Sequence, residues 1–261
     1  MNPDEYKKMY ELEELYWWFI GRRKLVKWLL RKHSPNGNES RVVDLGCGTG
    51  LNVSTFAEDY KTFGADYSPE ALKFCRARSL EGLFSCSAEA IALRDQSVDV
   101  VTALDVLEHI REDLPALREM NRILKPSGKL IVIVPAYGFL WSEHDEALHH
   151  YRRYVARELR AKLTASNFEI ERSTYFITGL FFPILFFRLW QGLRRTSIEA
   201  SVSYRLPPLW ANRLLIWLLD VERSLLDHFN LPFGVSLIVV GRKPEEALAT
   251  TRSNAVVPKV K

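Results

Sequence analysis

The chain of 261 residues contains 36 Lys and Arg against 32 Asp and Glu, a formal net charge of +4, and 47% of its residues are hydrophobic. Such a composition is typical of a globular protein and excludes a disordered or fibrous chain. The length fits one large α/β domain with an insertion, or at most two small domains. The small basic excess is compatible with nucleic acid or an anionic membrane as a partner but requires neither.

The cysteines and the distribution of apolar residues indicate the compartment. Cys47, Cys75 and Cys86 form no C-x-x-C pair, and this small odd number favours a reducing environment. Residues 1–8 are polar and charged, unlike the start of a secretion signal. The longest nearly uncharged run, residues 175–187, is shorter than the about 20 residues of a membrane-spanning helix. We therefore expect a cytoplasmic protein without a transmembrane helix.

The first predicted element is a helical segment at residues 4–32, dense in aromatic and basic side chains, which a turn cluster at residues 34–38 ends. Short strands then alternate with helices. The strands are predicted at residues 41–43, 62–65, 83–86, 98–104 and 129–134. The helices are predicted at residues 51–59, from a Ser-Pro-Glu start at residues 68–70, and at residues 112–124. This alternation indicates a parallel sheet with helices on both faces.

The last part of the chain adds a helix at residues 156–166 and two strands at residues 168–175 and 235–241. The connection between these strands, residues 177–234, is far longer than a hairpin loop and contains two apolar segments. We therefore interpret it as a helical insertion with a role of its own. Residues 243–261 mix Pro, Glu, Ala, Thr and Ser without periodicity and are expected to form a disordered tail.

Residues 42–50, with the sequence Val-Val-Asp-Leu-Gly-Cys-Gly-Thr-Gly, form the strongest pattern in the chain. Glycines at alternate positions after a strand let the backbone approach a ligand closely, and the N-terminus of the following helix favours an anionic group. A dinucleotide-binding loop has the spacing G-x-G-x-x-G, whereas the spacing here is G-x-G-x-G with an acid before it. A tight strand-to-helix turn without a ligand is the alternative interpretation.

Residues 44–50 resemble the first motif of class I S-adenosylmethionine-dependent methyltransferases. Further motifs of that family follow in order, with Asp66 after the second strand and residues 87–89 after the third. The turn at residues 124–128 is similar to the one that leads into the family's fifth strand. The resemblance implies a Rossmann-like, doubly wound sheet of seven strands with an antiparallel last strand, and S-adenosyl-L-methionine as the cofactor.

The resemblance also assigns individual residues to the cofactor. Asp66 would bind the two ribose hydroxyls, and Ala88 would meet the adenine through its backbone. Ser87 stands where the family commonly has Asp, which weakens the expected contact to the adenine amino group. The full set is Arg22, Asp44, Gly46, Cys47, Gly48, Gly50, Asp66, Tyr67, Ser87, Ala88, Glu89 and Leu104.

The N-terminal helical segment, residues 1–33, would by the same resemblance fold over the cofactor as a lid. Arg22 would then meet the methionyl carboxylate, and Trp18 would wall the pocket. The alternative is an amphipathic helix that packs on the edge of the sheet. The methyltransferase core would comprise residues 41–176 and 235–242.

Candidate catalytic residues follow the fourth strand, at the edge where doubly wound sheets bind ligands. In a helical turn, Asp105, Glu108 and His109 would share one face. Imidazole has an ordinary pKa of about 6.5, so His109 suits a general base. The trio also resembles a segment of the ubiquinone-pathway O-methyltransferases that binds a divalent metal, which makes it an alternative metal site. As a third interpretation, Glu108 and His109 are polar scaffold of the fold.

A second group of polar residues follows the fifth strand, at residues 141–154. His144 and Asp145 suit a general base and the residue that orients it, and Arg152 and Arg153 suit an anion clamp. The residues expected to contact substrate are Trp18, Glu108, Trp141, His150, Arg152, Arg153 and Tyr154. A loop held together by its own hydrogen bonds is the alternative interpretation.

Two broader patterns bear on the substrate class. Residues 105–109 lack the Asn/Asp-Pro-Pro-aromatic motif of amino-methylating DNA enzymes, which argues against nucleic acid as a partner. The aromatic and basic sequence at residues 17–23, together with residues 144–145 and 150–154, is similar to a bacterial methyltransferase group linked to glycan or lipid biosynthesis.

The insertion combines apolar bulk with positive charge. Residues 188–213 contain five Arg and one Glu, and Trp and Leu recur at near-helical spacing from residue 209 to residue 226. Helices of this kind suit the surface of an anionic membrane or a lipid-like substrate. We expect a peripheral contact with the inner face of the membrane through residues 177–233. The alternative is a subdomain that buries these residues in its own core or in a dimer contact.

Together these patterns predict an S-adenosylmethionine-dependent methyltransferase that acts on a small or lipid-linked acceptor, at oxygen. In-line methyl transfer needs chiefly a positioned nucleophile and removal of the hydroxyl proton. Two alternatives are open. One is a metal-assisted O-methyltransferase that acts on a polyprenylated phenol, and the other is a non-catalytic cofactor-binding module that docks on a membrane or a protein complex.

Overall fold

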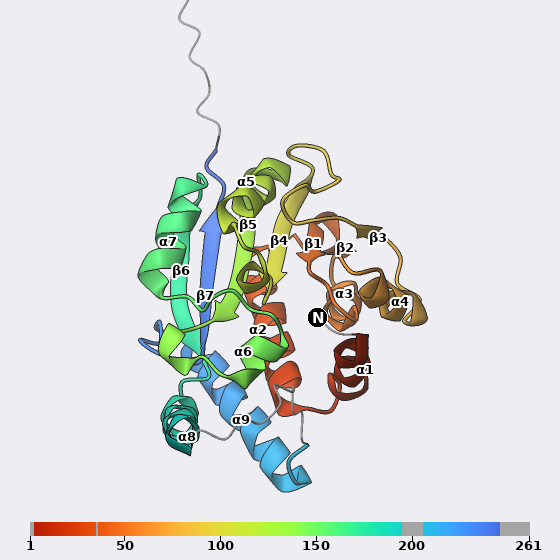
Figure 1. Cartoon of the computed structure of the whole chain (residues 1–261). Helices are drawn as coiled ribbons and strands as arrows, with labels where there is room; N and C mark the ends of the chain where they lie inside the picture. Colours follow the sequence, from red (N-terminus) through yellow and green to blue (C-terminus); the bar gives the residue numbers. More distant parts are fainter. Residues whose placement is uncertain (1–2, 35, 195–205, 246–261) are drawn as a thin grey trace, which may run out of the picture.

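The computed structural model describes residues 3–34, 36–194 and 206–245. Its centre is a seven-stranded sheet with the order β3-β2-β1-β4-β5-β7-β6 (Figure 1). Strands β1 to β5 are parallel, and β7 runs antiparallel to its neighbours β5 and β6. The strands are β1 (Arg41–Leu45), β2 (Lys61–Asp66), β3 (Leu83–Ser85), β4 (Val98–Leu104), β5 (Leu124–Pro135), β6 (Glu169–Phe176) and β7 (Ser236–Arg242). The predicted fold class is therefore confirmed.

Helices cover both faces of the sheet (Figure 1). Helices α2, α3 and α9 contribute to the apolar cluster on one face, and α5 and α7 to the cluster on the other. The helices are α1 (Pro3–Leu12), α2 (Trp17–His33), α3 (Leu51–Phe56), α4 (Pro69–Ala77), α5 (Asp113–Ile123), α6 (Glu143–Ala147), α7 (Ala156–Ala165), α8 (Phe181–Arg194) and α9 (Leu209–Leu225). Three single turns of 3-10 helix are η1 (Gly37–Glu39), η2 (Leu107–His109) and η3 (Gly138–Leu140).

The central strands β1, β4 and β7 are largely apolar because they are buried on both sides, whereas the edge strands β3 and β6 are partly exposed. In β1, Val42 packs with Leu25 and Leu29 of α2, whereas the next residue, Val43, belongs to the opposite cluster with Met120 of α5. Successive side chains of a strand point to opposite faces, so a doubly covered strand has no polar alternation. The short runs of Val and Ala that predicted the strands reflect this double burial.

The N-terminal helical segment is two helices rather than the single one predicted at residues 4–32. α1 ends at Leu12 and α2 begins at Trp17. Glu13, in the break, is buried and accepts hydrogen bonds from Thr49 and Arg78, so its side chain turns toward the sheet edge instead of continuing a helical surface. A tertiary contact therefore interrupts a stretch whose local pattern favours one helix.

The insertion before β7 contains α8 and α9, while residues 195–205 between them and residues 246–261 of the predicted tail lie outside the described residues. None of the described helices is long and apolar enough to cross a membrane. α9 packs on α2, where the Leu219 side chain lies over Gly21; a Cβ atom on Gly21 would come within 2.3 Å of Leu219 Cδ1. Glu222 of α9 is buried and accepts hydrogen bonds from the backbone N–H of Thr178. These contacts fix the insertion against the core.

The α2–α9 contact predicts an unequal response of two adjacent leucines. Leu219 is 3% exposed and belongs to the core cluster, whereas Leu218 is 37% exposed. Leu219→Ala should lower the free energy of unfolding by about 2–4 kcal/mol because it leaves a cavity against Gly21. The control Leu218→Ala should lower it by less than about 1 kcal/mol. Urea denaturation of both variants measures this, and equal losses would contradict the packing described.

Candidate active site

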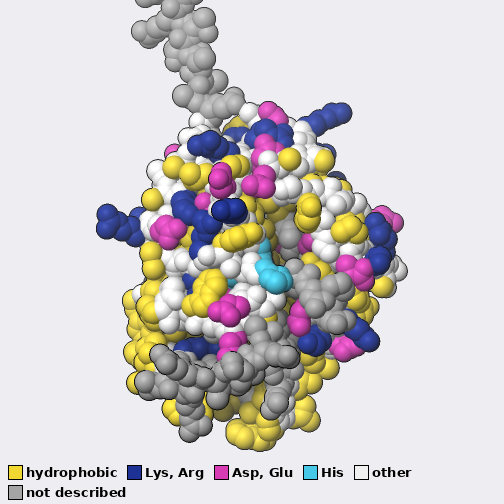
Figure 2. Space-filling view, in the orientation of Figure 1, with side chains coloured by type: hydrophobic (Ala, Val, Ile, Leu, Met, Phe, Trp, Pro, Cys, Tyr) yellow, Lys and Arg dark blue, Asp and Glu magenta, His cyan; other side chains and the backbone are white. Residues whose placement is uncertain are grey.

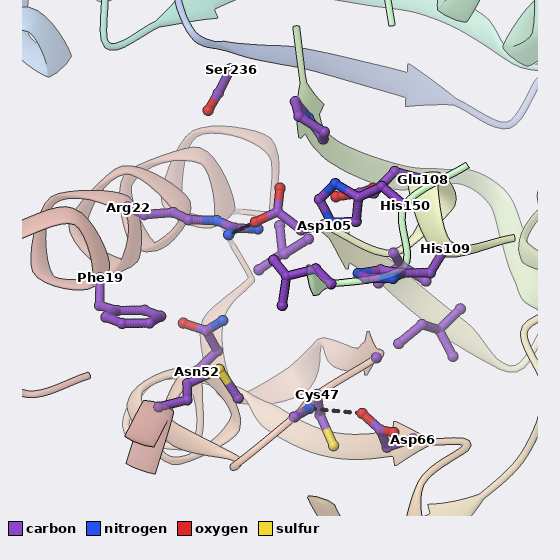
Figure 3. A pocket seen from close by; sticks show the side chains of 18 of the residues that line it. Phe19, Arg22, Cys47, Asn52, Asp66, Asp105, Glu108, His109, His150 and Ser236 are labelled. Carbon is purple, nitrogen blue, oxygen red and sulfur yellow. Dashed lines mark hydrogen bonds and ion pairs between the residues drawn. The ribbon is translucent and has the colours of Figure 1, made fainter. Parts of the chain in front are cut away.

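A cavity of about 1150 Å³ lies at the carboxyl ends of the parallel strands (Figure 3). Its walls come from the segments that follow β1, β2, β3 and β4, with α2 and α8 closing other sides. The strand order reverses between β1 and β4, and ligands of doubly wound folds bind at such a point. The volume exceeds the range of about 300–1,000 Å³ that is usual for ligand pockets, so the cavity has room for a cofactor and a second ligand together.

The glycine loop forms the cavity wall after β1. Gly46, Gly48 and Gly50 have φ values of +69°, +55° and +84°, which residues with a side chain rarely adopt. A Cβ atom on Gly46 would also lie 2.5 Å from Val106 Cγ2. Gly50 caps α3, so the free N–H groups of that helix start at the loop. The loop therefore presents backbone rather than side chains to a ligand.

Two acids flank the glycine loop in different ways. Asp66, at the end of β2, lines the cavity and accepts hydrogen bonds from the N–H groups of Gly48 at 2.9 Å and Ser68 at 2.8 Å. Asp44 lies beneath the loop, fully buried, and accepts a hydrogen bond from Thr102 Oγ1 at 2.6 Å. Burial raises the pKa of Asp44 to about 7. Asp66 is thus available to a ligand, while Asp44 supports the loop from below.

The break between α1 and α2 adds a contact that the sequence did not reveal. Thr49 Oγ1 donates to the Glu13 carboxylate at 2.7 Å, and Arg78 Nη2 donates to Glu13 at 2.6 Å. The terminal carbon of Met9 lies 2.9 Å from where a Cβ atom on Gly48 would be. The end of α1 is therefore fastened to the glycine loop. An isolated acid in a helical pattern carries no signal that would have identified this role for Glu13.

The first turns of α2 supply Trp18 and Arg22 to the cavity wall. The guanidinium of Arg22 forms an ion pair with Asp105 (Figure 3) and also lies 4.9 Å from the centre of the Trp18 ring. Asp105 has a φ of 54° and precedes the single turn η2, so it does not share a helical face with Glu108 and His109. The predicted trio on one helix face was wrong, because the segment after β4 is too short and too sharply turned.

A buried carboxylate organises the other end of the cavity. Asp145, in α6, accepts a hydrogen bond from His150 Nδ1 at 2.9 Å. Arg153 donates to both of its oxygens, at 2.8 Å from Nε and 2.9 Å from Nη2, and Ser142 donates through both its backbone and its hydroxyl. These partners outweigh the effect of burial and hold the pKa of Asp145 well below its usual range. Asp145 is therefore ionised at every pH at which the protein is expected to work.

The partner of Asp145 differs from the prediction, which paired it with His144. The structure pairs it with His150, five residues further along. His144 lines the cavity separately, and burial lowers its pKa to about 4. The imidazole that pairs with Asp145 is thus that of His150, and the predicted His144–Asp145 pairing was wrong.

His150 and His109 lie edge to face, with ring centres 4.6 Å apart, and Glu108 lies beside them (Figure 3). Burial lowers the pKa of His109 to about 3, and the neighbouring His150 lowers it further in the same direction. Burial raises the pKa of Glu108 to about 8, and neither of its carboxyl oxygens has a hydrogen-bond partner. At neutral pH this corner therefore holds a neutral imidazole and a protonated carboxyl group.

These three side chains are also the group that can offer ligands to a cation. Glu108, His109 and His150 each have a ligand atom within 4.8 Å of those of the other two. Nitrogen and carboxylate oxygen suit Zn²⁺ and other first-row metals. The set differs from the predicted Asp105, Glu108 and His109 because Asp105 pairs with Arg22 instead.

Most of the predicted site residues meet at this one cavity. Those that line it are Trp18, Arg22, Gly46, Cys47, Gly48, Asp66, Tyr67, Ser87, Ala88, Glu89, Leu104, Asp105, Glu108, His109, His144, His150 and Arg153. Lining residues that the sequence did not point to include Tyr6, Met9, Glu13, Asn52, Ile184, Phe187, Arg188 and Ser236. They come from segments far apart in the chain, so no local pattern could group them.

Six predicted residues do not line the cavity. Asp44 and Gly50 support the glycine loop, and Asp145 supports His150. Tyr154 is fully buried and its hydroxyl donates to Asp113 at 2.7 Å, while Arg152 also pairs with Asp113. Trp141 lies at the surface, where its indole N–H donates to Glu146. The expectation that Trp141, Arg152 and Tyr154 wall the substrate pocket is not met by this arrangement.

Comparisons with known proteins agree with this geometry. Residues 43–132 match a family model described as a methyltransferase domain. A protein of Mycolicibacterium smegmatis described as "Probable S-adenosylmethionine-dependent methyltransferase" is 30% identical over 223 residues, which cover 84% of this chain and 82% of that protein. The chain belongs to the S-adenosylmethionine-dependent methyltransferases.

Other members of this methyltransferase family are more distant. A ubiquinone biosynthesis O-methyltransferase of Xanthomonas oryzae is 26% identical over 185 residues, which cover 63% of this chain and 74% of that protein. The crystal structure of a SAM-dependent methyltransferase of Thermotoga maritima shares the fold with a TM-score of 0.59 at 19% identity, covering 92% of this chain and 95% of that one. The cofactor of this methyltransferase is thus S-adenosyl-L-methionine, as the sequence predicted.

The left-handed backbone of the glycine loop makes a prediction for cofactor binding. Gly48→Val should lower the affinity for S-adenosyl-L-methionine by at least about 100-fold, because a branched residue at a φ of +55° displaces the loop and crowds Met9. Gly138→Ala is a matched control, since a Cβ atom there meets nothing within 4 Å. Isothermal titration calorimetry compares the two, and unchanged affinity in Gly48→Val would contradict the loop's role.

The raised pKa of Asp44 makes a prediction for stability. A carboxyl group whose pKa rises from 3.8 to about 7 on folding binds more protons in the folded state between these two pH values. The free energy of unfolding should therefore fall as pH rises from about 4 to 7, by on the order of 1 kcal/mol per pH unit from this group. In Asp44→Asn the fall should be smaller by that amount. Urea denaturation at several pH values tests this, and parallel curves for the two proteins would refute it.

Proposed function

We propose that this methyltransferase transfers a methyl group to a hydroxyl oxygen of a small or lipid-linked acceptor, with His150 as the general base. The observation that carries the proposal is the buried Asp145–His150 pair, whose imidazole lines the same cavity as the glycine loop. A methyl acceptor with a hydroxyl group must lose a proton during the reaction, whereas the sulfonium of the cofactor already has a good leaving group. An oxygen acceptor therefore requires a base that is fixed in position to remove the hydroxyl proton.

The hydrogen bond to Asp145 defines which nitrogen of His150 is basic. Because Asp145 is ionised, Nδ1 of His150 carries the proton that it donates to that carboxylate. Nε2 then has the lone pair, and this atom is buried without a hydrogen-bond partner. The hydroxyl group of a bound acceptor could donate a hydrogen bond to Nε2.

The proposed reaction is a single displacement. The acceptor oxygen forms a bond to the cofactor's methyl carbon while the carbon–sulfur bond breaks, and the sulfonium becomes the neutral thioether of S-adenosylhomocysteine. The hydroxyl proton passes to His150 Nε2, and the negative charge of Asp145 stabilises the imidazolium that forms. Arg153, bonded to both oxygens of Asp145, keeps that carboxylate in place.

Two other histidines are weaker candidates for the base. His109 and His144 have pKa values lowered to about 3 and 4, so each imidazole is a poor proton acceptor at neutral pH. The imidazole whose hydrogen bond Asp145 accepts is that of His150. We therefore propose that His109 and His144 form part of the cavity wall and do not accept the proton.

A metal-assisted O-methyltransferase is the second candidate. The cluster of Glu108, His109 and His150 favours it, as does the 26% identity to a ubiquinone biosynthesis O-methyltransferase. A divalent cation there would polarise the acceptor hydroxyl in place of a base. The two candidates differ in their need for a metal, which a chelator tests directly.

The base proposal predicts that His150→Asn lowers kcat by about 100-fold or more while cofactor affinity changes by less than about threefold. His149→Asn is the control, because His149 is exposed and does not line the cavity. The assay is release of S-adenosylhomocysteine with phenol and lipid-extract acceptors, in buffer with and without EDTA. Wild-type turnover in His150→Asn would refute the base. Loss of wild-type turnover in EDTA, restored by a divalent cation, would favour the metal candidate.

A further inference from the structure

We propose that the outward faces of α8 and α9 form a docking surface for an anionic lipid bilayer. The surface consists of exposed aromatic and aliphatic side chains on the two helices of the insertion, named together the apolar face. Its members are Phe182, Phe186, Phe187, Leu189, Trp190, Leu209, Trp210, Leu214, Trp217, Leu218, Val221 and Leu225. This inference concerns where the protein works and does not depend on which atom it methylates.

α9 exposes an apolar side to the outside, whereas an ordinary surface helix buries that side. Trp210, Leu214, Trp217, Val221 and Leu225 recur at three- and four-residue intervals, so they share one side of the helix, and that side faces outward. Trp210 is 72% exposed and Trp217 is 58% exposed. A helix in contact with water normally turns such a stripe inward.

The inward side of α9 carries two polar residues whose side chains form hydrogen bonds with the backbone of neighbouring segments. Asn212 is buried, where it accepts from the backbone N–H of Trp17 at 3.0 Å and donates to the carbonyl of Leu15 at 2.8 Å. Glu222 is likewise buried and accepts from the backbone N–H of Thr178. These bonds fix the rotation of α9, so its apolar stripe cannot turn toward the core. The exposure of the stripe is therefore built into the fold.

α8 lies at the same end of the molecule as α9 (Figure 1). Phe182, Phe186 and Trp190 recur every four residues and are exposed. Figure 2 shows hydrophobic side chains gathered along this lower edge of the molecule. Large apolar side chains exposed in such number along two helices are unusual on proteins that contact only water and point to a site of interaction.

The cavity meets the apolar face along α8. Ile184 and Phe187 of this helix line the cavity, and Phe187 is also exposed on the outside. Arg188, the next residue, lines the cavity too. A ligand that leaves a bilayer at α8 would therefore pass from apolar side chains to charged ones without crossing open water. A soluble acceptor would gain nothing from this arrangement.

The composition of the apolar face favours a bilayer over a second copy of the chain. Trp is enriched at the boundary between acyl chains and headgroups, where its ring meets both environments. The exposed Arg213 lies on α9 between Trp210 and Trp217. Anionic headgroups attract this guanidinium, whereas a second copy of the same face offers it another Arg213. Each helix is also of a kind that lies in the interface rather than spanning the membrane.

Co-sedimentation of the full chain with vesicles tests the proposal. The probes are vesicles of phosphatidylcholine with and without 30% phosphatidylglycerol, a composition that we choose to vary surface charge alone. The wild-type protein should bind the anionic vesicles at least about 10-fold more tightly, and added salt should weaken that binding. Absence of sedimentation with the anionic vesicles would overturn the proposal.

Matched variants assign the binding to the apolar face. Trp210→Ser with Trp217→Ser should weaken vesicle binding by about 10-fold or more, and Arg213→Gln by roughly fivefold on anionic vesicles. Val221→Ser should weaken it measurably, whereas Val155→Ser should not, although these valines are 40% and 42% exposed. The exposed positions keep the variants folded, which calorimetric binding of S-adenosyl-L-methionine verifies.

Two outcomes would overturn the assignment. Equal vesicle binding by the Trp double variant and the wild type would show that another surface binds lipid. A wild-type dimer in analytical ultracentrifugation that the Trp double variant dissociates, together with no vesicle binding, would identify the apolar face as a contact between two copies. Either outcome leaves the His150 experiment interpretable, because that experiment measures turnover rather than sedimentation.

Discussion

The buried carboxylate of Asp145 is the constraint on which the acceptor side of the cavity depends. An ionised group removed from water must find hydrogen bonds or charge partners, or it becomes neutral. Asp145 finds them in Ser142, His150 and Arg153, which come from both sides of α6. One side chain thereby shapes a segment of twelve residues that has little regular structure of its own. The same requirement explains why α6 exists although it has five residues only.

The two buried acids of the cavity show how environment decides the state of a carboxyl group. Asp145 has donors on both of its oxygens and remains charged. Glu108 has none, and burial alone raises its pKa to about 8. Glu108 lines the cavity and holds a proton, whereas the ionised Asp145 does not line it and accepts a hydrogen bond from His150. Two buried side chains of the same chemical type can thus differ completely in protonation state.

The parts that sequence predicted well are those in which local chemistry and global fold agree. β4 was predicted at residues 98–104 and found there, and Ser68 caps α4 with its hydroxyl as expected. The pairing of Asp145 failed for a local geometric reason. His144 and Asp145 are consecutive in α6, and consecutive residues on a helix point in different directions. Asp145 pairs with His150 because the chain turns back toward Asp145 after α6. A short sequence pattern does not encode that turn.

The anchoring of α2 has a consequence for the rate at which product leaves. The core-facing side of α2 packs against the sheet through Leu25, Val26 and Leu29, so this helix does not swing as a unit without opening the hydrophobic core. α1, in contrast, makes no contact with the core clusters among the described residues and is held beside the glycine loop by the Glu13 hydrogen bonds and by the packing of Tyr10 on Phe74. The rate at which S-adenosylhomocysteine exchanges for fresh cofactor would then depend on how fast the hydrogen bonds of Glu13 break. Turnover would then be limited by the opening of this contact rather than by the methyl-transfer step.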